Sequence, residues 1–162
     1  MKKIPTDVDI VVDTGTLRMN AGGSVTGIVY FRFGDTAVPG EKWCDFVVCL
    51  LTWWLKSLAV MWLRIDVWRH QFRFMDDDFV VDGFCDSTGK LELAGRAYTK
   101  WPLSVDECFV VEPRELTWSL LSASEKVLDV VQAQGWTSPE ISEFARTLRR
   151  ARELVSRGSA VE

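Results

Sequence analysis

The sequence contains few of the residues that catalytic and metal sites use most often. Its only histidine is His70. One histidine excludes every site built from several, including a helical His-Glu-x-x-His zinc motif, and no serine elbow lies near it. We expect His70, in "WRHQFRF", to lie at the surface on the polar side of a strand rather than to act as a general base.

Cysteine is sparse as well, and its spacing carries no motif. The chain has no Cys-x-x-Cys pair among Cys44, Cys49, Cys85 and Cys108, which excludes the commonest zinc and redox motifs. The opening "MKKIPTDVDIVVD" lacks the uninterrupted apolar stretch of a secretory signal. We therefore predict buried, reduced thiols in a cytoplasmic protein, with no disulfide, no metal and no other cofactor.

Positive charge is also in deficit. Lys and Arg number 19 against 23 Asp and Glu, a net charge of -4. Binding nucleic acid mainly through charge requires clustered Lys and Arg, so we expect no direct nucleic-acid partner. The segment "AGGSVTG" is not a phosphate loop either, because no Gly-Lys-Ser/Thr ends it and no helix pattern follows. The deficit favours a cationic partner.

What the sequence does contain, at 48% hydrophobic and 26% charged residues, is typical of one globular domain. Residues 8–13 and 24–33 alternate apolar and polar side chains, which predicts a hairpin turning at Gly22 and Gly23. Three further segments predict a meander: "HQFRFM", "FVVDGFCD" and "LELAGRAYTKW". The segment "ECFVV" fits either one more strand or the approach to a helix.

Two C-terminal helices are predicted by apolar stripes of helical period. The first covers about residues 113–134, starts at Pro113 and ends at Gly135. The second follows a cap at Ser138 and ends at Gly158. The stripes consist of Leu116, Leu120, Leu121, Val127, Leu128 and Val131 in the first helix, and Ile141, Phe144, Leu148, Ala151 and Val155 in the second.

Five of the eight tryptophans lie in residues 43–68, "WCDFVVCLLTWWLKSLAVMWLRIDVW". The apolar run from 46 to 63 approaches the length of a membrane span, and exposed tryptophans also stack on bases. We predict instead a helix over about 41–63 at the centre of a soluble core, because strand-like segments flank it and a polar seam runs along one side. The seam consists of Glu41, Asp45, Thr52 and Lys56. Of the five tryptophans, we expect Trp43 and Trp68 to be the most exposed.

Acidic side chains concentrate in "MDDDFVVDGFCD". Between residues 66 and 92, seven acidic side chains face three basic ones. A turn and outward strand positions would present these aspartates as a patch that attracts a basic partner. Paired carboxylates could instead hold Mg²⁺ for phosphoester cleavage, or the segment is simply a solvated turn. The candidate partner-binding residues are Asp76, Asp77, Asp78, Asp82 and Asp86.

Two segments resemble small bacterial immunity proteins found beside polymorphic or contact-dependent growth-inhibition toxins. They are "VYFRFGDTAVPGEKWCDFVVCLLTWWLKSL" and "FRFMDDDFVVDG", and the likeness covers roughly residues 28 to 84, about a third of the chain. The likeness lies in an aromatic strand, a Pro-Gly approach, a Trp-x-Asp-Phe helix start, a Trp-Trp pair and a Phe-Met-Asp strand end. It implies a non-enzymatic cytoplasmic inhibitor that binds one cognate toxin, frequently a nuclease.

Together these patterns predict an α+β domain with an antiparallel sheet packed on a long hydrophobic central helix and two C-terminal helices. The domain is expected over residues 1–158, followed by a flexible tail at 159–162. The resemblance makes toxin binding the leading function, with the aspartates meeting cationic toxin residues. The alternatives are a small metal-dependent phosphoesterase that uses the Asp76 to Asp86 cluster, and a membrane-associated protein. The oligomeric state and the toxin's identity stay open.

Overall fold

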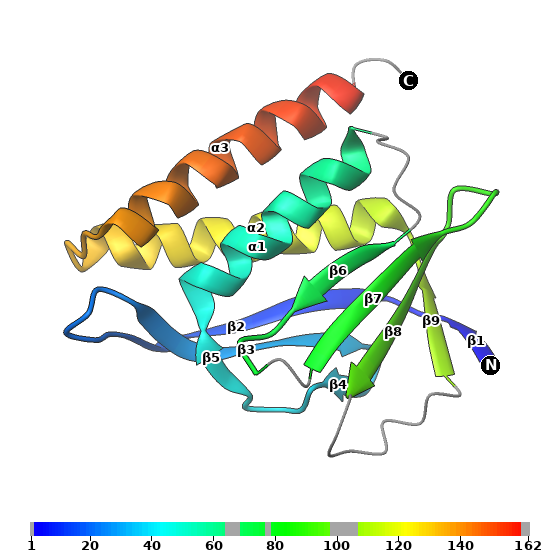
Figure 1. The fold of residues 1–162 in the computed structure, drawn as a ribbon, viewed down its shortest axis with the longest axis horizontal. Helices are drawn as coiled ribbons and strands as arrows, with labels where there is room; N and C mark the ends of the chain where they lie inside the picture. Colours follow the sequence, from blue (N-terminus) through cyan, green and yellow to red (C-terminus); the bar gives the residue numbers. More distant parts are fainter. Residues whose placement is uncertain (1, 64–68, 77–78, 98–106, 160–162) are drawn as a thin grey trace.

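The described part of the protein is an α+β fold of nine strands and three helices, whose arrangement Figure 1 shows. The structure is a computed structural model that describes residues 2–63, 69–76, 79–97 and 107–159. The strands are β1 (Lys2–Pro5), β2 (Val8–Met19), β3 (Val25–Phe33), β4 (Thr36–Val38), β5 (Cys44–Phe46), β6 (His70–Arg73), β7 (Phe79–Cys85), β8 (Leu91–Ala97) and β9 (Glu107–Val111). The helices are α1 (Val47–Trp62), α2 (Pro113–Ala133) and α3 (Pro139–Ser159).

The strands form two sheets rather than the single sheet expected. One has the order β1-β9-β8-β7-β6, and the other has β2-β3-β4 with β5 paired to the far end of β3. The predicted hairpin is β2 with β3, and the predicted meander is β6, β7 and β8. The segment "ECFVV" is the strand β9, which pairs antiparallel with β8 and parallel with β1. Alternation did not predict β1, whose strand partner in the described part of the chain is β9, about a hundred residues further along the sequence.

Aromatic side chains join the two sheets. Phe31 on β3 contacts Phe72 and Phe74 at the end of β6, with ring centroids 5.7 and 6.3 Å apart. Phe33 stacks on Phe109 of β9 at 4.5 Å. Trp54 of α1 meets Phe31 at 4.9 Å, so the central helix closes the same core. Figure 1 shows the three helices together on one side of the strands.

Helix α1 is central, as expected, but starts later than the predicted residue 41. The residues immediately before it form β5, which pairs with β3. The Asp45 carboxylate accepts hydrogen bonds from Trp43 Nε1, Phe46 N and Met75 N. The predicted polar seam is therefore wrong in part: Asp45 and Thr52 are buried, and only Glu41 and Lys56 are exposed.

The two C-terminal helices agree with prediction. All five stripe residues of α3 are buried, as are those of α2 apart from the partly buried Leu128. Gly135 has a φ of 68° and completes a Schellman cap in which Trp136 N donates to Val131 O. Ser138 Oγ accepts from Ile141 N, which confirms the cap of α3.

Gly158 has a different role from the predicted helix end, because α3 continues to Ser159. A Cβ atom at residue 158 would lie 2.7 Å from Cζ3 of Trp62. Glycine is thus needed for the close approach of α3 to the end of α1. Residues 160–162 of the predicted tail lie outside the described residues.

Candidate functional site

The aspartates that are neighbours in sequence do not form one surface. Asp76 is exposed in the turn between β6 and β7, whereas Asp86 follows β7 at its other end. A strand of seven residues separates the two turns by about 20 Å, since each residue rises about 3.3 Å. Asp77 and Asp78 lie outside the described residues. The described carboxylates therefore share neither a single patch nor a metal site.

Asp82 corrects the expectation of an outward-facing carboxylate. It is fully buried, at 0% exposure, and is held by the side chain of Arg69. Arg69 Nε donates to Oδ1 and its Nη2 to Oδ2, both at 2.8 Å, while Gln71 Nε2 donates to Oδ1 at 3.1 Å. Two parallel bonds to one guanidinium satisfy both oxygens of this carboxylate. Asp82 is therefore a structural residue that joins β7 to the start of β6.

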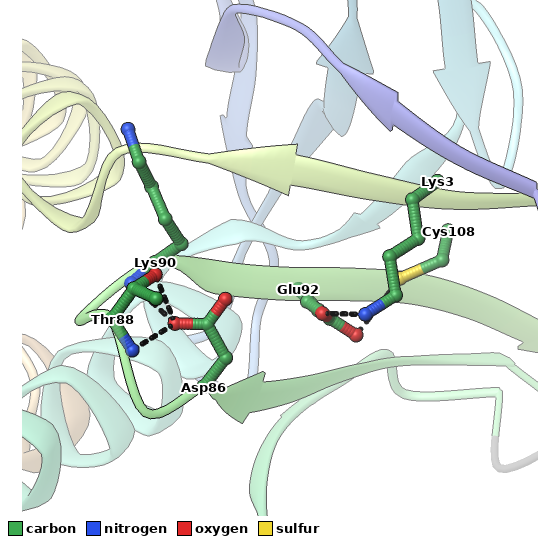
Figure 2. A network of polar contacts seen from close by, with 6 residues as sticks. All are labelled: Lys3, Asp86, Thr88, Lys90, Glu92 and Cys108. Carbon is green, nitrogen blue, oxygen red and sulfur yellow. Dashed lines mark hydrogen bonds and ion pairs between the residues drawn. The ribbon is translucent and has the colours of Figure 1, made fainter.

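Asp86 is also engaged, in the turn between β7 and β8 (Figure 2). Its Oδ1 accepts from Thr88 N, Thr88 Oγ1 and Lys90 N at 2.7 to 3.0 Å. The hydrogen bond from the Thr88 side chain is the main cause that lowers the pKa of the carboxyl group. Three donors commit the Oδ1 oxygen of this carboxylate to the turn.

A second polar contact lies beside this turn, on β8, β9 and β1 (Figure 2). Glu92 pairs with Lys3, and the Cys108 thiol lies 3.9 Å from the Glu92 carboxylate. The Glu92 contact raises the pKa of Lys3, while burial raises the pKa of Cys108. A raised thiol pKa disfavours the thiolate, so Cys108 is not an activated nucleophile. The contact ties together three strands of the sheet.

A hollow of the described surface lies between β2 and α2, and we call it the β2–α2 groove. Its volume is about 630 Å³, and the indole of Trp118 stands beside it with 61% of the residue exposed. Ser119 Oγ accepts from Ile10 N at 2.7 Å and fixes α2 against the edge of β2. The sequence held one signal for Trp118: it is a tryptophan outside the apolar stripe of an amphipathic helix.

A second hollow lies between α1 and β6, and we call it the α1–β6 pocket. It has a volume of about 460 Å³ and is lined by Trp53, Ser57, Val60, Arg69, His70, Gln71 and Arg73. Trp53 is 39% exposed, so it and not Trp43 is the most open described tryptophan of its segment; Trp68 lies outside the described residues. His70 is buried on the inner face of β6, which corrects the predicted surface position, and burial lowers its pKa.

The thiols differ partly from prediction. All four cysteines are free, but only Cys108 is buried, and Cys44 and Cys85 are exposed. Burial raises the pKa of Cys49 to about 11. Burial also raises the pKa of Cys85, and a raised pKa disfavours the nucleophilic thiolate at both residues.

Two findings bear on the alternatives of a membrane-associated protein and a metal-dependent phosphoesterase. None of the helices within the described ranges is long and apolar enough to cross a membrane. No group of three or more His, Cys, Asp or Glu side chains able to hold a metal ion occurs in the described part of the chain.

No protein-family model, curated protein or solved structure matches the chain.

Proposed function

We propose that the protein binds one cognate bacterial toxin and neutralises it in the cytoplasm, as an immunity protein does. Two observations support this proposal: the resemblance of residues 28–84 to such proteins, and the exposed indole of Trp118 beside the β2–α2 groove. Exposed tryptophans that become buried in a complex contribute a disproportionate share of binding free energy. Trp118 is the observation on which the position of the interface depends.

The β2–α2 groove presents apolar and acidic side chains besides the indole of Trp118. Val11 and Val12 supply half-buried apolar surface beside Trp118. The carboxylates of Asp7 and Glu115 border the same groove and make no ion pair within the described residues. An apolar centre with charged groups at its edge is the usual composition of a protein interface.

This composition moves the proposed acidic contact away from the aspartate cluster. Asp82 is buried and bonded to Arg69, so it is not available to a cationic partner, and Asp86 already uses its Oδ1 oxygen within its turn. We place the complementary charge at Asp7 and Glu115 instead. In this mechanism, basic toxin residues that otherwise hold nucleic-acid phosphate pair with these carboxylates, and the inhibitor covers them.

Co-expression with the protein encoded immediately upstream tests the function. We expect that protein to be toxic alone, to be tolerated with this one, and to copurify with it. Absence of both toxicity and copurification contradicts the proposal.

A variant tests the interface separately. Trp118→Ala should weaken toxin binding about tenfold or more, because an exposed indole is lost from the contact, without changing the unfolding midpoint. Leu63→Ala is the matched control, since Leu63 is another exposed apolar side chain, at 55%, outside the groove. Unchanged affinity of Trp118→Ala would move the interface elsewhere.

A further inference from the structure

The α1–β6 pocket lies on the open edge of β6. This strand is last in its sheet, so its outer edge faces α1 rather than another strand. Phe74 N donates to Phe79 O at 3.2 Å, which continues the ladder to β7 through alternate residues. The backbone groups of Gln71 and Arg73 consequently point away from β7, toward the pocket side.

The carbonyls at this edge are occupied. Gln71 O accepts from Ser57 Oγ, and Arg73 O accepts from Trp54 Nε1, each at 2.7 Å. The amide N–H groups of Gln71 and Arg73 make no hydrogen bond within the described ranges of the chain. The edge therefore presents donors to the pocket while its acceptors are already used.

That asymmetry determines what kind of ligand fits. An added β-strand needs donors and acceptors in alternation, so the blocked carbonyls disfavour a peptide strand here. A ligand that brings only acceptors suits the two free amides. Successive outward amides of one strand lie about 6.8 Å apart, which is the span of one aromatic ring with an acceptor at each end.

The side chains of the pocket agree with this chemistry. Arg73 uses one guanidinium nitrogen on Gln71 Oε1, at 3.0 Å, and keeps further donors for an anion. His70 is 5% exposed, and its imidazole has no hydrogen-bond partner among the residues that the structure describes. Trp53 and Val60 supply an apolar wall. A volume of about 460 Å³ is within the usual range for a small-molecule site.

We propose that the α1–β6 pocket binds a small planar anion whose acceptor oxygens take the amides of Gln71 and Arg73 and whose ring lies against Trp53. The guanidinium of Arg73 carries the charge complementarity. This site is separate from the β2–α2 groove and does not depend on toxin binding.

Titration of the isolated full chain with benzene-1,4-dicarboxylate, benzoate and neutral benzyl alcohol tests the site. The indole N–H signals in ¹H–¹⁵N spectra are the readout, with Trp53 assigned from Trp53→Phe. We expect a saturable shift of the Trp53 signal with the two anions, stronger for the dicarboxylate, and none with benzyl alcohol. No saturable shift, or an equal response to the neutral compound, would overturn the proposal.

Variants locate the bound anion. Arg73→Gln should weaken benzene-1,4-dicarboxylate binding about tenfold, the usual effect of losing one charge-assisted hydrogen bond. Arg150→Gln removes an exposed arginine on α3 outside the pocket and should leave the affinity unchanged. Equal affinities of the two variants would place the anion elsewhere. Protection of cells against the toxin is the last readout for Arg73→Gln. Normal protection is expected if the ligand is a free small molecule. Lost protection would overturn the small-molecule site and assign the pocket to an acidic side chain of the toxin.

Discussion

The two sides of helix α1 carry neighbouring tryptophans with opposite surroundings. Trp54 has no exposed surface, packs on Phe31 and Phe74, and donates to Arg73 O. Trp53 is 39% exposed and borders the α1–β6 pocket. One residue along a helix rotates a side chain by about 100°, which is enough to move an indole from the core to a binding surface.

The comparison also explains how an edge strand is protected here. Trp54 and Ser57 of α1 occupy the outward carbonyls of β6, so the core-facing side of the helix blocks strand addition. The outward amides of β6 belong to residues that line the α1–β6 pocket together with Trp53. Stability and binding are thus divided between adjacent residues, and substitutions can separate them.

The largest effect is expected from Trp54→Ala. Removing a fully buried indole should lower the free energy of unfolding by about 3 to 5 kcal/mol, measured by urea denaturation. Trp54→Phe keeps most of the apolar contact but loses the donor to Arg73 O, and should cost about 1 kcal/mol. Equal losses for the two variants would mean that the hydrogen bond, and not the packing, dominates.

Arg69→Ala should follow, because it removes the guanidinium from a fully buried carboxylate. We expect a loss of about 2 to 3 kcal/mol in unfolding free energy, since Asp82 keeps its 0% exposure but loses two charge-assisted bonds. Arg32→Ala is the control: its pair with Asp9 is exposed on both sides and should contribute less than about 1 kcal/mol. Similar losses in both variants would contradict the structural role of Asp82.

His70 should make the stability depend on pH. Burial lowers its pKa in the folded state, so the unfolded chain binds a proton first as the pH falls through 6.5. The neutral ring contributes fully to the free energy of unfolding above pH 6.5, and this contribution is lost as acid protonates the unfolded state. Urea unfolding between pH 7.5 and 5.5 should show this decline, and His70→Gln should reduce its slope. Parallel slopes in the two proteins would exclude His70 as the cause.

The sequence predicted the fold where local patterns decide it. The apolar stripes and caps of α2 and α3 depend on neighbours along the chain, as at Ser138 and Gly135, and these are confirmed. Asp82 could not be predicted, because strand alternation placed it outward, whereas Arg69 and Gln71, distant in sequence, bond its buried carboxylate. The start of α1 was missed for a similar reason, since β5 pairs with β3 far away in sequence.

Trp53→Ala should have the smallest effect on stability and is the sharpest test of the comparison. Its side chain is 39% exposed, so we expect the unfolding free energy to fall by about 1 to 2 kcal/mol, less than for Trp54→Ala. Binding of benzene-1,4-dicarboxylate, measured by calorimetry, should nevertheless be weakened about tenfold, because the apolar wall of the pocket is lost. A large loss of stability would place Trp53 in the core. An unchanged affinity would mean that the donors of β6, without the indole, hold the anion.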